Sequence, residues 1–104
     1  LKLNLLKKHY HKWLKKKIKK RLAFLNPTSF ILNDESELHK GHKGNTGGSH
    51  FNINIVSDNF LGKSRMERHR IIYEALNDLF PNEIHALSIK ASTEEEILWK
   101  KYSY

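Results

Sequence analysis

Residues 49–57 read Ser-His-Phe-Asn-Ile-Asn-Ile-Val-Ser, and this stretch decides the fold because apolar and polar side chains alternate along it. Phe51, Ile53 and Ile55 point to one side of an extended chain, since successive side chains of a strand face opposite ways. The residues between them are polar, so His50 is expected to face solvent. The alternation predicts a strand in an antiparallel pair, with one face buried and the other solvated.

Two further strands are predicted around this one. Residues 29–34 (SFILND) alternate in the same way, with the phenylalanine and the leucine on one face. Residues 35–48 (ESELHKGHKGNTGG) hold four of the five glycines and predict a flexible loop between the two strands. Residues 83–91 (EIHALSIKA) alternate again. His85 stands at the head of the apolar side of this third strand.

A long amphipathic helix is predicted before the strands. Apolar residues recur from Leu3 to Leu25 with a period near 3.6, and lysines fill the gaps. Asn26-Pro27 ends the helix, because proline disfavours a helical conformation in the residue before it. Such a helix is over about 30 Å long, more than a small domain needs to cover its core. Residues 1–9 are therefore expected to form a basic N-terminal extension that projects or frays, and residues 10–104 a single domain.

Two capping-box spacings predict where the other helices begin. Ser64 and Glu67 open one helix, which Pro81 closes, and Thr93 and Glu96 open a short last helix. The inward side of the middle helix is expected to carry Met66, His69, Ile72 or Tyr73, Leu76 and Phe80. The last helix has three large apolar residues available for packing, namely Ile97, Leu98 and Trp99.

The expected order is helix, strand, strand, helix, strand, helix, which is an α+β pattern. The first two strands form an antiparallel hairpin. A crossover through the helix at residues 64–80 makes the third pairing parallel. We therefore expect a three-stranded mixed sheet with helices on one face.

The composition limits the possible functions. The chain has 104 residues, a formal net charge of +8 and no cysteine, so it forms no disulfide and no thiolate zinc site of its own. No apolar run approaches the roughly 20 residues of a membrane-spanning helix. The first 33 residues hold ten Lys or Arg and no acidic residue, whereas the remaining 71 hold nine basic and eleven acidic residues, a net charge of −2. The basic character therefore belongs to the N-terminal segment.

Several segments together resemble the BolA family. They are DES at 34–36, LHKGH at 38–42, GSHF at 48–51, IVSDNFLG at 55–62, ERHRIIYEAL at 67–76 and IHALSIKAST at 84–93. The resemblance covers roughly residues 26–96 and implies a fold similar to the type II KH domain. It also implies partnership with a monothiol, CGFS-type glutaredoxin, with which family members hold a shared [2Fe-2S] cluster in iron-sulfur delivery or iron regulation. Some members have been linked to DNA binding and transcription.

The same resemblance implies the cluster ligands. They fall on His39 in the loop and on His85, with His42 as an alternative loop ligand. Imidazole can replace thiolate on one iron of such a cluster. The resemblance assigns the other two ligands to the glutaredoxin cysteine and a bound glutathione, which fits a chain without cysteine. The isolated chain is expected to be monomeric and to carry no cluster, and His50 and His69 are expected to be structural.

A nucleic-acid-binding transcriptional regulator is the alternative function. Lys63, Arg65, Arg68 and Arg70 surround a predicted helix start and form a plausible phosphate-contact surface. The G-x-x-G loop of KH modules is missing at the helix-helix position where it is needed. Residues 41–44 (GHKG) match its spacing but lie in the strand-strand loop. No paired acids, activated nucleophile or nucleotide-binding loop is found, so no enzymatic activity is expected.

The compartment stays open between the cytoplasm and the mitochondrial matrix. A basic helix without acidic residues is typical of membrane-surface segments and of mitochondrial presequences. Residues 1–9 have this character, although serine and arginine are nearly absent from the N-terminal helix, which counts against a presequence.

Overall fold

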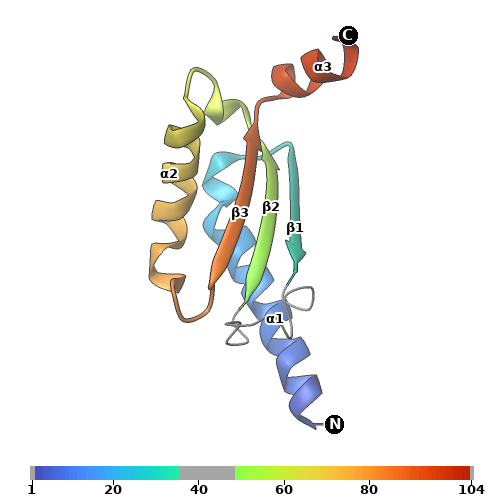
Figure 1. Cartoon of the computed structure of the whole chain (residues 1–104), viewed down its shortest axis with the longest axis vertical. Coiled ribbons are helices and arrows are strands. Elements are labelled where there is room, and N and C mark those ends of the chain that lie inside the picture. Colours follow the sequence, from blue (N-terminus) through green and yellow to red (C-terminus); the bar gives the residue numbers. More distant parts are fainter. Residues whose placement is uncertain (1, 36–48, 104) are drawn as a thin grey trace, which may run out of the picture.

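The computed structural model describes residues 2–35 and 49–103, and within them the elements follow the predicted order. Figure 1 shows the three strands side by side with α1 behind them. The elements are α1 (Lys2–Arg21), β1 (Ser29–Asp34), β2 (His50–Val56), α2 (Arg65–Leu76), β3 (Ala86–Ser92) and α3 (Glu94–Tyr102), with short 3-10 turns at Ala23–Leu25, Asp58–Phe60 and Asn77–Leu79. The predicted α+β fold is confirmed.

The sheet has the predicted mixed topology. Its strand order is β1-β2-β3, with β2 antiparallel to β1 and parallel to β3. Ile53 lies opposite Leu32 on one side and opposite Ile89 on the other. Because β2 is the central strand, its apolar residues are flanked by those of β1 and β3 and covered by the helices.

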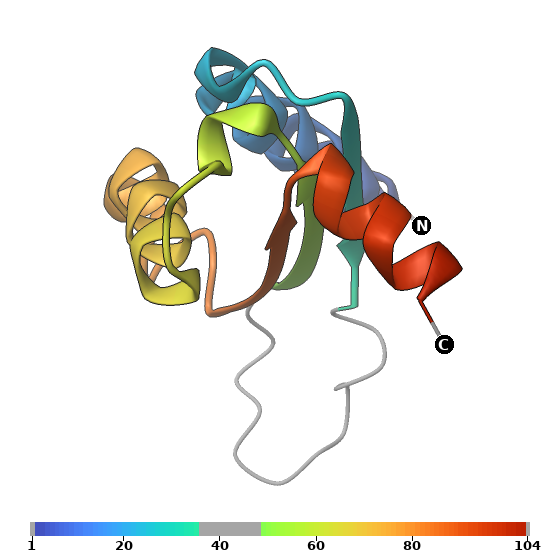
Figure 2. The same ribbon diagram turned by 90° about the horizontal axis from the view of Figure 1, so that it is seen from above.

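The core lies between this sheet and two helices. Figure 2 shows α1 and α2 on the same side of the sheet, while α3 extends on the other side. The predicted inward residues of β2 are fully or almost fully buried, and α1 contributes one apolar residue per turn. The buried core comprises Leu14, Ile18, Leu22, Leu25, Phe51, Ile53, Ile55, Phe60, Ile72, Leu76, Leu79 and Ile84.

The expected inward side of α2 is wrong at Met66, and of the two alternatives Ile72 and Tyr73 it is Ile72 that faces the core. Met66 is 71% exposed and Tyr73 is 40% exposed, whereas Ile72 and Leu76 are buried. The sheet-facing row runs at intervals of four residues through Arg68, Ile72 and Leu76, and the Arg68 side chain is only 11% exposed. Arg68 thus occupies the first sheet-facing position of α2, where the apolar pattern predicted Met66. The α-helix also ends at Leu76, before the predicted closure at Pro81.

The last helix does not pack as expected. The Thr93–Glu96 capping box is present with both of its hydrogen bonds, so α3 begins where predicted. However, α3 buries no residue, and Ile97, Leu98 and Trp99 are all exposed. Figure 1 shows the reason, because α3 leaves the upper end of the sheet and extends away from it.

The first helix extends beyond the sheet at its N-terminal end (Figure 1). The α-helix is continuous from Lys2 to Arg21, and residues 5–10 are all exposed. It ends four residues earlier than predicted, because the last turn tightens into the 3-10 helix before Asn26, whose φ of 46° is left-handed. No described helix is long and apolar enough to cross a membrane.

Candidate functional site

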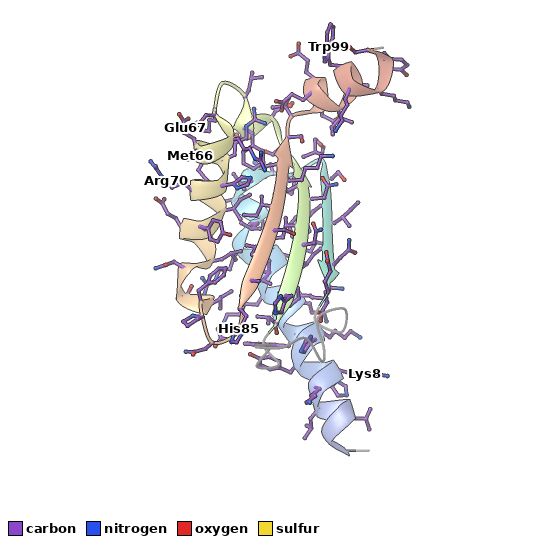
Figure 3. The ribbon with its side chains drawn as sticks, viewed as in Figure 1. Lys8, Met66, Glu67, Arg70, His85 and Trp99 are labelled. Carbon is purple, nitrogen blue, oxygen red and sulfur yellow. The ribbon has the colours of Figure 1, made fainter. Side chains whose placement is uncertain are left out.

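All three strands start or finish at the same end of the sheet, which we call the loop end. β1 finishes there at Asp34, and β2 and β3 start there at His50 and Ala86. His85 immediately precedes β3 and is exposed, so it lies just outside the strand whose apolar side it was predicted to head. Figure 3 places it at the lower end of the sheet.

The backbone around His85 is held by the preceding strand. The backbone N–H groups of His85 and Ala86 both donate to the carbonyl oxygen of Ser49, at 2.8 and 3.2 Å. Ser49 is itself buried, so this anchor is protected from water. An exposed imidazole on an anchored backbone suits a ligand that must reach a metal outside the chain. His50, expected to face solvent, is half-buried.

A histidine-carboxylate pair lies at the same end and was absent from the predicted site residues. Nδ1 of His11, on α1, contacts the Asp34 carboxylate at the end of β1. The His11 ring centroid also lies 6.4 Å from that of Phe51. The signal for this position was its spacing, since His11 comes three residues before the buried Leu14 and therefore shares the inward face of α1.

The two candidate loop ligands, His39 and His42, lie outside the described residues, so their assignment stays a prediction. Within residues 2–35 and 49–103, no group of three or more His, Asp or Glu side chains is arranged to hold a metal ion. Of the predicted ligands, His85 is therefore the one that lies within the described residues. Imidazole can replace thiolate on one iron of a [2Fe-2S] cluster, and the chain has no cysteine, so the thiolate ligands of such a cluster would have to come from another molecule.

The basic residues predicted to contact nucleic acid are only partly brought together. A groove of about 550 Å³ lies between the start of α2 and β3. It is lined by Lys63, Arg65, Arg68, His69, Ile89, Lys90, Ala91 and Glu96. Figure 3 shows Arg70 on the side of α2 that faces away from the sheet, so it does not join them. Lys90 was not predicted, because its place beside α2 depends on the position of β3.

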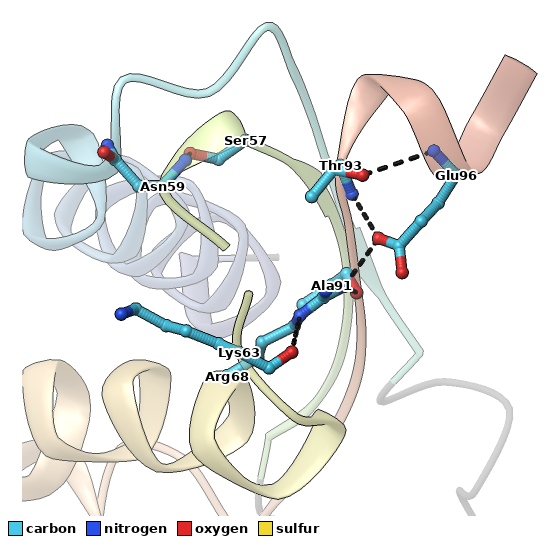
Figure 4. Close-up of polar contacts among 7 residues, drawn as sticks. All are labelled: Ser57, Asn59, Lys63, Arg68, Ala91, Thr93 and Glu96. Carbon is cyan, nitrogen blue, oxygen red and sulfur yellow. Dashed lines mark hydrogen bonds and ion pairs between the residues drawn. The ribbon is translucent and has the colours of Figure 1, made fainter. Parts of the chain in front are cut away.

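The Arg68 side chain is largely covered and joins three elements (Figure 4). Its Nε donates to the carbonyl oxygen of Lys63 at 2.9 Å, and its Nη1 donates to the carbonyl oxygen of Ala91 at 3.1 Å. The same Nη1 lies 2.7 Å from Oε1 of Glu96, which also accepts the backbone N–H of Thr93. These two donors, Arg68 first, lower the pKa of Glu96 to about 2. The Arg68 guanidinium therefore makes its contacts within the fold, which favours a structural role over contact with a phosphate.

The element order and the mixed sheet define a KH-like α+β domain. The family model for BolA-like proteins matches residues 12–96, and the chain belongs to this family.

Two plant relatives and one bacterial relative show the range of the family. The chain is 44% identical over 79 residues to SufE-like protein 1, chloroplastic/mitochondrial, of Arabidopsis thaliana, covering 70% of this chain and 21% of that protein. It is 38% identical to Protein BOLA1, chloroplastic, of the same plant, covering 69% and 48%. It is also 38% identical to the DNA-binding transcriptional regulator BolA of Haemophilus influenzae, covering 71% and 68%. The chain thus spans less than half of either plant relative.

The fold likeness extends to a solved domain. The BolA domain of SufE1 from Arabidopsis thaliana superimposes with a TM-score of 0.67 at 45% sequence identity. The alignment covers 78% of this chain and 92% of that domain, so the resemblance extends over nearly the whole solved domain.

Proposed function

We propose that this chain is a non-enzymatic adaptor that co-holds or transfers a [2Fe-2S] cluster with a monothiol, CGFS-type glutaredoxin. The observation that carries the proposal is the exposed His85 at the loop end, with its backbone anchored on Ser49. Membership of the BolA-like family supports it. His85 supplies one imidazole ligand, and the loop supplies the second through His39 or through the alternative His42.

The cluster is cargo in this proposal, and its remaining ligands come from outside the chain. A [2Fe-2S] cluster with two imidazoles on one iron has a higher reduction potential than an all-thiolate cluster. The other iron is bound by the glutaredoxin cysteine and by the thiol of glutathione. The role of this chain is to present two imidazoles at one end of a rigid sheet, which favours the mixed complex over a glutaredoxin homodimer.

The test reconstitutes the cluster with the glutaredoxin, glutathione, iron and sulfide, and records the visible absorption and circular dichroism of the mixed complex. With His85→Ala, we expect the spectrum of the mixed complex to be lost or to revert to that of glutaredoxin alone. His9→Ala is the matched control, because His9 is exposed on α1. An unchanged spectrum and unchanged affinity for His85→Ala would show that the ligand assignment is wrong.

The two loop histidines are separated by single and double substitution. If His39 is the ligand, His39→Ala alters the spectrum and His42→Ala does not. The reverse result assigns His42. A double variant that keeps the wild-type spectrum removes the loop from the site altogether.

Nucleic-acid binding is the second candidate, and the basic groove beside α2 favours it. Lys63, Arg65 and Lys90 line this groove, and the Haemophilus influenzae relative is named a DNA-binding regulator. We expect the double variant Lys63→Gln/Arg65→Gln to weaken binding to a DNA duplex and to reduce the slope of log affinity against log salt by roughly 2. Arg70→Gln is the matched control outside the groove. Binding that disappears near physiological salt whatever the DNA sequence would contradict a regulatory role.

A further inference from the structure

The apolar row by which α1 packs on the sheet continues past the end of the strands. Leu14, Ile18 and Leu22 follow one another at intervals of four residues, and all three are fully buried. The same interval leads back from Leu14 to Tyr10 and Leu6, which are 42% and 64% exposed. The helix thus keeps an apolar row over two turns where the sheet no longer covers it (Figure 1).

Trp13 widens this row into a patch of three large apolar side chains. Its ring centroid lies 5.8 Å from that of Tyr10, and its side chain is about half exposed. The Lys17 ammonium group stands 4.7 Å from the centre of the Trp13 ring. Leu6, Tyr10 and Trp13 are called the α1 patch below. Two of its members, Tyr10 and Trp13, have an apolar body and a polar group, as side chains at a membrane-water interface do.

The α1 patch lies on a helix with no acidic residue. Lysines occupy most of the remaining solvent-facing positions of α1. Figure 3 shows one of them, Lys8, extending away from the helix. From residue 7 onwards they are Lys7, Lys8, Lys12, Lys15, Lys16, Lys17, Lys19 and Lys20. The helix surface around the α1 patch is therefore strongly basic, although two acidic side chains from other segments lie near it, since Glu83 acts on Tyr10 and Asp34 contacts His11.

Charge and apolarity together select the kind of partner. A second copy of this chain would bring lysines against lysines, which costs free energy at low ionic strength. A nucleic acid would pair with the lysines but would leave Leu6 in water. A bilayer with anionic headgroups satisfies both features, because it accepts apolar and aromatic side chains below the headgroups and lysines among them.

We propose that α1 is an interfacial helix that binds the surface of an anionic phospholipid bilayer through Leu6, Tyr10 and Trp13, with its lysines among the headgroups. The helix lies on the membrane and does not span it. Binding holds the domain at the surface with the loop end of the sheet close by, since His11 of the same helix contacts Asp34 there. This proposal does not depend on the cluster-binding function.

The test measures how the full chain distributes between solution and vesicles. Trp99→Phe removes the tryptophan of α3, so that Trp13 is the single tryptophan reporter. With vesicles of phosphatidylcholine containing about 30% phosphatidylserine, we expect a blue shift of Trp13 emission and co-sedimentation of the protein. With phosphatidylcholine alone, we expect an affinity at least about tenfold lower.

Variants separate the apolar contribution from the charge. Leu6→Ser/Trp13→Ser is expected to weaken binding to the anionic vesicles at least about tenfold, and co-sedimentation reports it without a fluorophore. Leu98→Ser on α3 is the matched control, since Leu98 is also about half exposed. Both substituted α1 residues are exposed, and far-ultraviolet circular dichroism checks that each variant is folded. If the double variant binds anionic vesicles as well as the wild type does, or if a DNA duplex blue-shifts Trp13 more strongly, the proposal is overturned.

Discussion

Arg68 and Glu96 lie 28 residues apart in the sequence, and their side chains meet at 2.7 Å, where α2, β3 and α3 come together. The same guanidinium donates to the carbonyl oxygens of Lys63 and Ala91. The Glu96 carboxylate also caps α3 through the backbone N–H of Thr93. This contact connects the start of the last helix to the edge of the sheet.

Replacing Arg68 by lysine tests this connection. Lysine keeps the positive charge but cannot direct donors at all three acceptors. Because Arg68 is largely buried, we expect Arg68→Lys to lower the free energy of unfolding by about 1–3 kcal/mol, as measured by urea denaturation. Arg70→Lys, on the outer side of α2, should change it by less than about 0.5 kcal/mol. Equal values for the two variants would contradict the structural role of Arg68.

The Glu96 pair should make stability depend on pH. In the folded state the pKa of Glu96 is lowered from 4.5 to about 2, because Arg68 and the Thr93 N–H donate to its carboxylate. A lowered folded-state pKa means that the carboxylate contributes its full stability above pH 4.5 and loses it as the pH falls toward 2. Since Glu96 is half exposed, the contribution is below about 1 kcal/mol.

The pH dependence is measured as the difference in unfolding free energy between the wild type and Glu96→Gln. We expect this difference to be constant from pH 7 to 5 and to shrink progressively between about pH 4.5 and 2. Glu95→Gln, one residue earlier on α3, is the matched control. A difference that grows as the pH falls would contradict the sign.

The contact between His11 and Asp34 should be measurable as a coupling between α1 and the end of β1. In a double-mutant cycle of His11→Ala and Asp34→Ala, we expect the two changes to be non-additive by roughly 0.5–2 kcal/mol. The measurement is urea denaturation near pH 6. His9→Ala combined with Asp34→Ala provides the control cycle and should be additive. Additivity in the first cycle would mean that the contact does not stabilise the fold.

The assignment of the inward face of α2 gives a direct comparison between two apolar residues. Ile72 is fully buried, so Ile72→Ala should lower the free energy of unfolding by about 2–5 kcal/mol. Met66 is 71% exposed, so Met66→Ala should change it by less than about 0.5 kcal/mol. Thermal or urea unfolding of both variants tests this. A large effect at Met66 would restore the ladder expected from the sequence.

The sequence by itself determined the strands, their order and the direction of their pairing. These features follow from local pattern, because alternation identifies a strand face and a helix of this length between two strands favours a parallel, right-handed crossover. The core residues of β2 and the start of α3 at Thr93 were predictable for the same reason. His85 could be recognised by its family motif, and the structure added its exposure and its anchor on Ser49.

Only the tertiary structure decided which polar side chains meet. His11 and Asp34 are 23 residues apart, and Arg68 and Glu96 are 28 apart, so no local spacing joins either pair. The exposure of the apolar residues on α3 and on the first turns of α1 was equally beyond local pattern. Periodicity shows that a helix has an apolar face, but whether the sheet extends far enough to cover that face depends on where the helix lies.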